Sequence, residues 1–96
     1  MTRIALSRRA DADLADILDY SIAAHEPETA EAYLHAVDAV LARLSHYPEL
    51  GAARPDLGPG IRSIPAGEHR VYYRYDGQTV LVVRVLHKAM DAERHL

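Results

Sequence analysis

The sequence predicts an α+β fold, in which an N-terminal strand is followed by an antiparallel helical hairpin packed on one face of a small antiparallel β-sheet (β-α-α-β-β-β). Three observations support this order. The chain has 96 residues, 49% hydrophobic and 26% charged, which is typical of one globular domain spanning residues 1–96. Its first half contains two segments with helical spacing of apolar residues. Its second half contains β-rich segments separated by glycine and proline.

The first strand is expected over residues 3–6, a short apolar stretch. Ser7 follows it, and a serine hydroxyl is well suited to accept a backbone N–H at the start of a helix. Apolar residues then recur at helical spacing, which predicts a first helix from about Arg8 to Ala24. The face that would pack on the sheet contains Leu14, Ile17, Leu18, Ser21 and Ile22.

A second helix is expected from Pro27 to near Tyr47. Proline is favoured at the first helical position, and Glu28 suits the positive end of the helix dipole. The connection between the two helices, which contains His25, is only two or three residues long, so the helices must fold back as an antiparallel hairpin. The apolar stripe of the second helix consists of Ala30, Tyr33, Leu34, Val37, Val40, Leu41 and Leu44.

Residues 48–60 contain three prolines and three glycines and are expected to form a loop. Three strand candidates follow, over residues 61–64, 69–75 and 78–86. The last two are joined by Asp76-Gly77, a dipeptide typical of two-residue hairpin turns. The pairs expected from such a turn are Tyr72 with Leu81, Tyr73 with Val80, and Val71 with Val82.

The last strand is apolar on both of its faces. The residues that strict alternation assigns to one face are Val80, Val82 and Leu86, and those assigned to the other are Leu81, Val83 and Val85. The helical hairpin can cover only one of these faces. The other is covered either by a partner protein or by the chain's own loop and C-terminal tail, and the sequence leaves both possibilities open.

Composition excludes several classes of function. The net charge of −3 disfavours binding to nucleic acid through net charge alone, so no direct nucleic-acid contact is expected. The absence of cysteine excludes disulfides, thiol nucleophiles and thiolate metal sites. Apolar runs of about five residues are far shorter than the roughly 20 that cross a bilayer, and the N-terminus lacks a signal-peptide pattern. We expect a cytoplasmic protein without a membrane partner.

Motifs for metal or nucleophile chemistry are weak. His35 and His46 would share a helix face about 16 Å apart, too far for one ion, and no serine lies in a nucleophile motif. We therefore expect no cofactor, no metal site and no catalytic residue. A cationic cluster on or beside the sheet either binds RNA phosphate for metal-free phosphodiester cleavage or pairs with carboxylates of this chain or a partner. The cluster consists of Arg62, Arg70, Arg74, Arg84, His87 and Lys88.

Several local motifs, taken in order, resemble those of ParE-type toxins. The opening of that family is similar to Leu6-Ser7-Arg8-Arg9-Ala10 with Asp13-Leu14 and Ile17. Its Pro-x-x-Gly after the second helix is similar to Pro48-Glu49-Leu50-Gly51. Its three final strands are similar to Ile61-Arg62, His69-Arg70-Val71-Tyr72-Tyr73-Arg74 and Val83-Arg84-Val85-Leu86-His87. Over nearly its whole length the chain is identified as a member of the RelE/ParE superfamily, on the ParE side.

The resemblance implies the toxin component of a type II toxin–antitoxin system. Such a toxin is held inactive in a tight hetero-oligomer with a cognate ParD-like antitoxin. ParE-type toxins inhibit DNA gyrase by protein–protein contact, which causes growth arrest and gives plasmid or chromosomal stability. RelE-type toxins share the fold but cut mRNA on the ribosome, so the fold alone does not determine the activity.

Departures from the ribonuclease pattern favour gyrase inhibition. Where the ribonucleases have lysines, this chain has Ile61 and Ser63. Near the C-terminus Ala89 follows Lys88 in place of an arginine, and His95 stands where a tyrosine is expected. Loss of several cations would slow phosphodiester cleavage by orders of magnitude. The alternatives are a RelE-like ribosome-dependent mRNA endoribonuclease and an inactive homologue that acts only as an antitoxin-binding module.

Two contact surfaces are expected, one for the antitoxin from the resemblance and one for gyrase from the mixture of cations and apolar residues in the C-terminal stretch. The antitoxin would cover apolar residues of the second helix and the sheet, and its acidic residues would pair with arginines. The residues expected to bind the antitoxin are Tyr33, Val37, Arg62, Arg70, Tyr73, Arg74, Val80 and Val82. DNA gyrase would contact the stretch that follows the last strand. The residues expected to face gyrase are His87, Lys88, Met90, Arg94 and His95.

Overall fold

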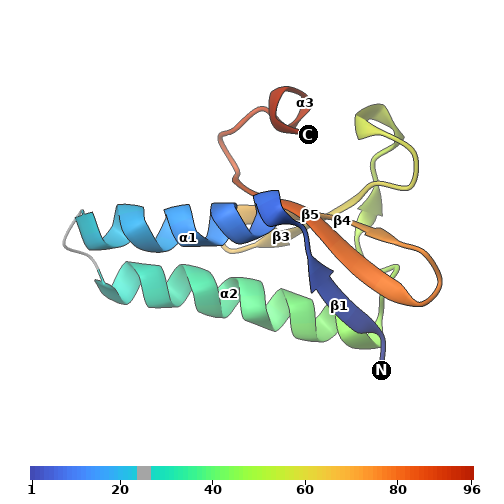
Figure 1. Ribbon diagram of the computed structural model, residues 1–96, viewed down its shortest axis with the longest axis horizontal. Coiled ribbons are helices and arrows are strands. Elements are labelled where there is room, and N and C mark those ends of the chain that lie inside the picture. Colours follow the sequence, from blue (N-terminus) through green and yellow to red (C-terminus); the bar gives the residue numbers. More distant parts are fainter. Residues whose placement is uncertain (24–26) are drawn as a thin grey trace.

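The computed structural model describes the backbone of residues 1–23 and 27–96 and the side chains of residues 1–19 and 28–96. The predicted helix end at Ala24, the turn residue His25 and the side chains of Ser21 and Ile22 lie outside these residues. The predicted order of elements is confirmed, with a short strand, a single 3₁₀ turn and a C-terminal helical turn added (Figure 1). The elements are β1 (Arg3–Leu6), α1 (Arg8–Ala23), α2 (Pro27–His46), β2 (Ala52–Ala53), η1 (Pro55–Leu57), β3 (Arg62–Ala66), β4 (His69–Tyr75), β5 (Thr79–His87) and α3 (Ala92–His95).

Within the described residues the strands form one five-stranded sheet in the order β1-β5-β4-β3-β2. β5 pairs with β4 in antiparallel fashion but with β1 in parallel, from Arg3 opposite Thr79 to Leu6 opposite Val82. The sheet is antiparallel from β2 to β5, as predicted, and β1 joins it in parallel, so the whole sheet is mixed. A parallel pair needs a long connection between its strands, which the helical hairpin and the intervening strands provide.

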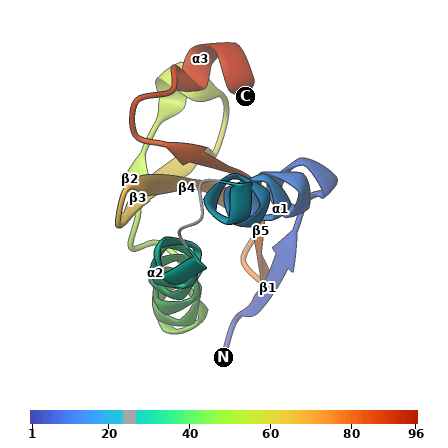
Figure 2. The same cartoon turned by 90° about the vertical axis from the view of Figure 1, so that its left-hand side faces the viewer.

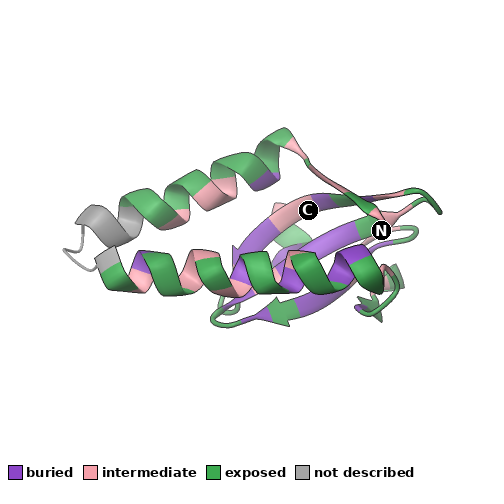
Figure 3. Ribbon diagram, turned by 90° about the horizontal axis from the view of Figure 1, so that it is seen from below, coloured by how far each residue is buried: buried purple, intermediate pink, exposed green. Residues whose placement is uncertain are grey.

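The two helices run antiparallel, as predicted, and pack on one face of the sheet (Figure 2). Buried positions lie along the sheet side of α2 and through the central strands, while the outer sides of the helices are exposed (Figure 3). On α1 the residues that contact the core are Ala10, Leu14 and Ile17, whereas Leu18, which was expected there, is exposed. The buried core on this face consists of Ala10, Val37, Val40, Leu44, Ile64, Ala66, Val71, Tyr73, Val80, Val82 and Val85.

The turn between β4 and β5 is wider than the predicted two-residue turn. Tyr75 pairs with Val80, so the predicted partners Tyr73 and Val80 are not opposite each other. The cause is the Asp76 side chain, which accepts hydrogen bonds from the backbone N–H groups of Gln78 at 2.8 Å and Thr79 at 2.7 Å. These two bonds close a longer loop and lower the pKa of Asp76.

A bulge in β5 reverses the alternation of its side chains. Tyr72 pairs with Arg84 but Tyr73 pairs with Val82, which leaves Val83 as the extra residue. Val85 therefore faces the helices, and Leu86 faces the opposite side. The predicted assignment of these two residues to the faces was wrong, because strict alternation does not hold across a bulge.

The second face of the sheet is covered largely by the chain itself. Tyr72 and Leu86 are buried there beneath Ile61 and Ala92, with Leu57, Val83 and Leu96 packed around them. Figure 2 shows α3 and the loop that contains η1 on the side of the sheet opposite α2. Of the two possibilities left open by the sequence, cover by the chain's own loop and tail is therefore the one observed for this cluster.

Candidate functional site

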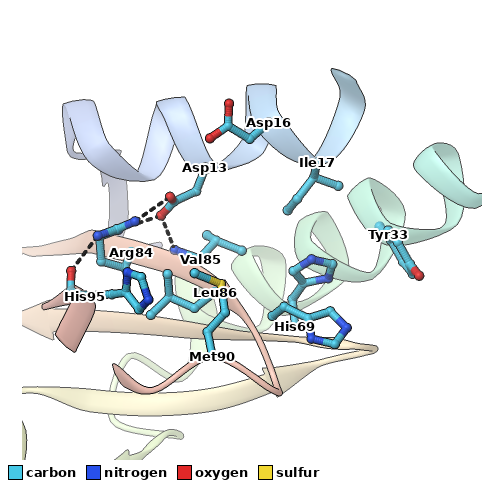
Figure 4. Close-up of a pocket in the computed structure, with 11 residues that line it drawn as sticks. Asp13, Asp16, Ile17, Tyr33, His69, Arg84, Val85, Leu86, Met90 and His95 are labelled. Carbon is cyan, nitrogen blue, oxygen red and sulfur yellow. Dashed lines mark hydrogen bonds and ion pairs between the residues drawn. The ribbon is translucent and has the colours of Figure 1, made fainter. Parts of the chain in front are cut away.

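A pocket of about 720 Å³ lies between the helical hairpin and the C-terminal end of β5 (Figure 4). Its wall combines elements that are far apart in the sequence, from α1 and α2 to the tail after β5. The pocket carries carboxylates, imidazoles, one phenol and an apolar floor. The residues that line it are Asp13, Asp16, Ile17, Tyr33, His69, Arg84, Val85, Leu86, His87, Met90 and His95.

One wall is an ion pair between Asp13 of α1 and Arg84 of β5. The guanidinium makes two parallel hydrogen bonds to the carboxylate, Nε to Oδ2 and Nη2 to Oδ1, each 2.8 Å long (Figure 4). The side chain of Arg84 is only 12% exposed and that of Asp13 only 11%. The backbone N–H of Val85 also donates to Asp13 Oδ2 at 2.9 Å. This bidentate geometry raises the pKa of Arg84 and fixes α1 to β5.

The opposite wall is built around His69, which is only 6% exposed. Its ring contacts Tyr33 edge-on with 4.9 Å between centroids, and His87 edge-on with 5.4 Å. His69 Nδ1 is buried and finds no hydrogen-bond partner among the described residues. Burial lowers the pKa of His69, and the neighbouring His87 lowers it further. The ring is therefore neutral near pH 7.

The rim of the pocket is formed by the segment that follows β5. Lys88 Nζ lies 2.6 Å from a carboxylate oxygen of Glu68, an exposed pair that lowers the pKa of Glu68. The ring of His87 accepts a hydrogen bond at Nδ1 from the N–H of Ala89 at 3.1 Å, so the neutral ring carries its proton on Nε2. Met90, 39% exposed, lines the pocket together with His69, His87 and His95.

The residues expected to face gyrase come together on this segment. His87, Met90 and His95 line the pocket, and Lys88 extends from the rim. Arg94 points away from the body of the molecule with 83% of its side chain exposed, and its Nε lies 3.6 Å from Asp91. The structure thus gathers all five on one short stretch, with apolar, aromatic and cationic groups available to a partner.

The residues expected to bind the antitoxin divide into two groups. Val37, Tyr73, Val80 and Val82 are at most 1% exposed and belong to the core between helices and sheet. They offer no surface in this structure, and the expectation that they contact a partner does not hold here. The reason is that helix and sheet bury each other's apolar faces, which periodicity alone does not distinguish from a docking face.

The other four lie at or near the surface. Tyr33 lines the pocket, Arg70 donates to Ser63 Oγ at 3.4 Å, and Arg74 is exposed. Arg62 is held by the backbone carbonyls of Glu49 at 3.1 Å and Gly51 at 2.8 Å.

Two members of the predicted cationic cluster form ion pairs within the chain. Arg84 pairs with Asp13, and Lys88 pairs with Glu68, so pairing within the chain is the correct interpretation for both.

Sequence reasoning gave no site role to Asp16, Ile17 or His69. A correct register for the β4–β5 pair would have placed His69 opposite His87, and it was the wider turn and the bulge that concealed this. In the described part of the chain, no group of three or more histidines or acidic residues is arranged to hold a metal ion. Nor does any helix described there have the length and apolar character needed to cross a membrane.

Comparison with known proteins identifies relatives of this chain. A family model described as "ParE toxin of type II toxin-antitoxin system, parDE" matches residues 4–92. Toxin ParE1 of Mycobacterium tuberculosis is 38% identical over 96 residues, covering 99% of this chain and 98% of that protein. Toxin ParE1 of Caulobacter vibrioides is 40% identical over 91 residues, covering 95% of this chain and 94% of that protein.

Solved structures agree with the sequence relatives. A chain of the chromosomal ParDE toxin–antitoxin system from P. aeruginosa superposes with a TM-score of 0.75 at 25% identity, covering 91% of this chain and 96% of that one. A chain of the toxin–antitoxin complex RelBE2 from Mycobacterium tuberculosis gives 0.64 at 26% identity, covering 91% and 98%. With the α+β fold, the resemblance and the relatives in agreement, the chain belongs to the ParE toxin family of type II toxin–antitoxin systems.

Proposed function

We propose that this toxin inhibits DNA gyrase by direct protein contact through residues 87–96, the target-facing segment, and that a ParD-like antitoxin neutralises it in a tight hetero-oligomer. The observation that carries the proposal is the exposure of this segment at the rim of the pocket. Met90 and Arg94 are exposed, while Ala92 and Leu96 attach the segment to the sheet. An exposed segment with apolar and cationic side chains, held on a rigid sheet, is suited to recognising a protein surface.

The proposal includes no chemical step by this chain. Arg84, one of the cations that a ribonuclease site on this sheet would need, is engaged with the carboxylate of Asp13 at a poorly exposed position. His69 is neutral and buried, and the ring of His87 packs against it. This arrangement supports inhibition through surface contact over cleavage of mRNA.

For the antitoxin we propose a surface made of the pocket and the outer face of β4. Tyr33 presents its ring at the pocket, and Arg70 and Arg74 lie on the sheet face away from the helices, where acidic side chains could pair with them. Because His87, Met90 and His95 also line the pocket, an antitoxin bound there would contact the target-facing segment directly. Neutralisation would then occur by occlusion.

The test is a DNA supercoiling assay with purified gyrase, ATP and the toxin freed of its antitoxin. We expect loss of supercoiling or accumulation of cleaved DNA, relieved when a ParD-like antitoxin is added back. Folded protein that leaves supercoiling unchanged would contradict the proposal. Primer extension on translated message, with Arg70→Ala and His87→Ala as variants, would then measure ribosome-dependent cleavage. Binding to the antitoxin without either activity would indicate an antitoxin-binding module only.

A further inference from the structure

Arg84 joins three parts of the molecule. Its Nε and Nη2 donate to the carboxylate of Asp13 on α1, and its Nη1 donates to the backbone carbonyl of His95 in the C-terminal turn. The residue itself lies on β5, next to the bulge at Val83. A guanidinium is suited to this arrangement because its N–H groups form a rigid planar fork. One side chain thus connects helix, sheet and tail.

The start of α1 is anchored at the same bulge. The Ser7 hydroxyl donates to the carbonyl of Val83 at 2.9 Å and accepts the N–H of Ala10 at 3.0 Å. Ser7 N–H also donates to the carbonyl of Val82 at 2.9 Å. The bulge therefore determines where α1 begins, and the carboxylate of Asp13, six residues after Ser7 on this anchored helix, reaches Arg84.

The C-terminal turn depends on such outside support. α3 has only four residues, too few for a helix to be stable in isolation. It is capped by Asp91, which accepts the N–H of Glu93 at 3.1 Å. Beyond the cap, its attachment consists of apolar contacts from Ala92 and Leu96 and the hydrogen bond from Arg84 to His95. Apolar contacts allow the turn to shift along the surface, whereas a hydrogen bond from a guanidinium to a carbonyl oxygen specifies one position.

We infer that Asp13 and Arg84 are positioning residues for the target-facing segment. Asp13 holds the guanidinium in one orientation, and the guanidinium holds the end of the segment through His95. Neither residue has to touch the target, because their side chains are buried against the body of the molecule. The role of the segment rests on the proposed function. The consequence is that gyrase inhibition depends on an ion pair behind the contact surface, since an ordered segment binds without an entropy cost of ordering.

The experiment compares Arg84→Lys with wild-type protein. A lysine keeps the positive charge beside Asp13 but cannot donate to Asp13 and His95 together. We expect hydrogen exchange at the amides of Arg94 and Leu96, which hydrogen-bond within the C-terminal turn, to become about tenfold faster. The amides of α2 should be unchanged. The concentration that half-inhibits gyrase should rise about tenfold.

The chain provides a matched control in the pair Arg54–Asp56. Arg54 makes the same two-bond fork to a carboxylate, at 3.1 and 2.9 Å, but it lies on an exposed loop and, among the described residues, donates no hydrogen bond to the C-terminal turn. Arg54→Lys should leave inhibition and exchange in α3 unchanged. Should Arg84→Lys fold poorly, Asp13→Asn combined with Arg84→Gln removes both buried charges together and avoids leaving one unpaired.

Two results would overturn the inference. Unchanged exchange at Arg94 and Leu96 in both Arg84 variants would show that the pair does not position the segment. Fast exchange with undiminished inhibition would show that gyrase inhibition does not depend on this positioning. If wild-type toxin fails to inhibit gyrase, the proposed function is contradicted instead. The two failures are distinguishable because the exchange comparison needs no gyrase.

Discussion

His69 illustrates how the surroundings of one side chain determine its chemistry. The ring is packed edge-on between Tyr33 and His87, and its Nδ1 has no hydrogen-bond partner within the described chain. Protonation would place a charge in a poorly hydrated site beside a second histidine. The neutral form is therefore the one compatible with the closed wall of the pocket.

This burial predicts a pH dependence of stability. Histidine in an unfolded chain titrates near about pH 6.5, whereas burial lowers the pKa of folded His69. Between these two pKa values the unfolded chain binds more protons than the folded protein. The free energy of unfolding therefore has its full value above about pH 6.5 and falls as the pH drops towards the folded pKa. Urea midpoints at about pH 7.5 and 5.5 measure the loss. This loss should be smaller in His69→Gln than in wild type, whereas His35→Gln, on the exposed face of α2, should lose as much as wild type. An equal loss in wild type and His69→Gln would contradict this explanation.

Gly51, the glycine of the Pro-x-x-Gly motif, lies against a buried tyrosine. Its N–H donates to the hydroxyl of Tyr73 at 2.8 Å, and burial raises the pKa of that hydroxyl. A Cβ at this position would lie 2.7 Å from the Tyr73 ring and 2.9 Å from the Ser63 carbonyl oxygen. Close approach of loop and sheet therefore requires glycine here.

Replacing Gly51 with alanine should lower the free energy of unfolding by about 1–3 kcal/mol through overpacking. Tyr73→Phe is the comparison, since it removes only the hydrogen bond and should cost about 1 kcal/mol. Chemical denaturation of both variants gives the two values. A Gly51→Ala protein as stable as wild type would mean that the loop can move away from Tyr73 without cost.

At the scale of elements, length decides what the sequence could predict. The helices are 16 and 20 residues long, enough for apolar spacing to reveal them. β2 has two residues and α3 four, too few to show any periodicity. The predicted β4–β5 register was wrong for a different reason. The observed register depends on the hydrogen bonds that the Asp76 carboxylate accepts and on the extra residue Val83, and neither alters the hydrophobic pattern.

The C-terminal turn should stabilise the molecule as well as present a surface. Leu96 packs on the cluster that contains Tyr72 and Leu86, so Leu96→Ala should lower the free energy of unfolding by about 1 kcal/mol. Thermal unfolding would register this as a decrease in Tm of about 4–8 °C. Leu50→Ala, at an exposed position, is the control. No difference between the two variants would show that the tail does not cover this face in solution.

At the scale of the whole molecule, the site is assembled from both ends of the chain. Its wall runs from Asp13 on α1 to His95 in the last turn. The sequence indicated the C-terminal part, because that stretch follows the last strand and mixes cations with apolar residues. The part from α1 and β4 could not be predicted, since it depends on the parallel pairing of β1 with β5 and on the bulge that directs Arg84 to Asp13.

The central claim is that the target-facing segment inhibits gyrase. The most direct measurement is the half-inhibitory concentration in a supercoiling assay for Met90→Ser combined with Arg94→Glu. Both side chains are exposed, so folding should be preserved. Leu50→Ser with Arg43→Glu, two exposed positions outside the segment, is the matched control. We expect the first variant to need about tenfold more protein than wild type and the control to match wild type. Inhibition by the Met90/Arg94 variant that equals that of wild type would contradict the claim.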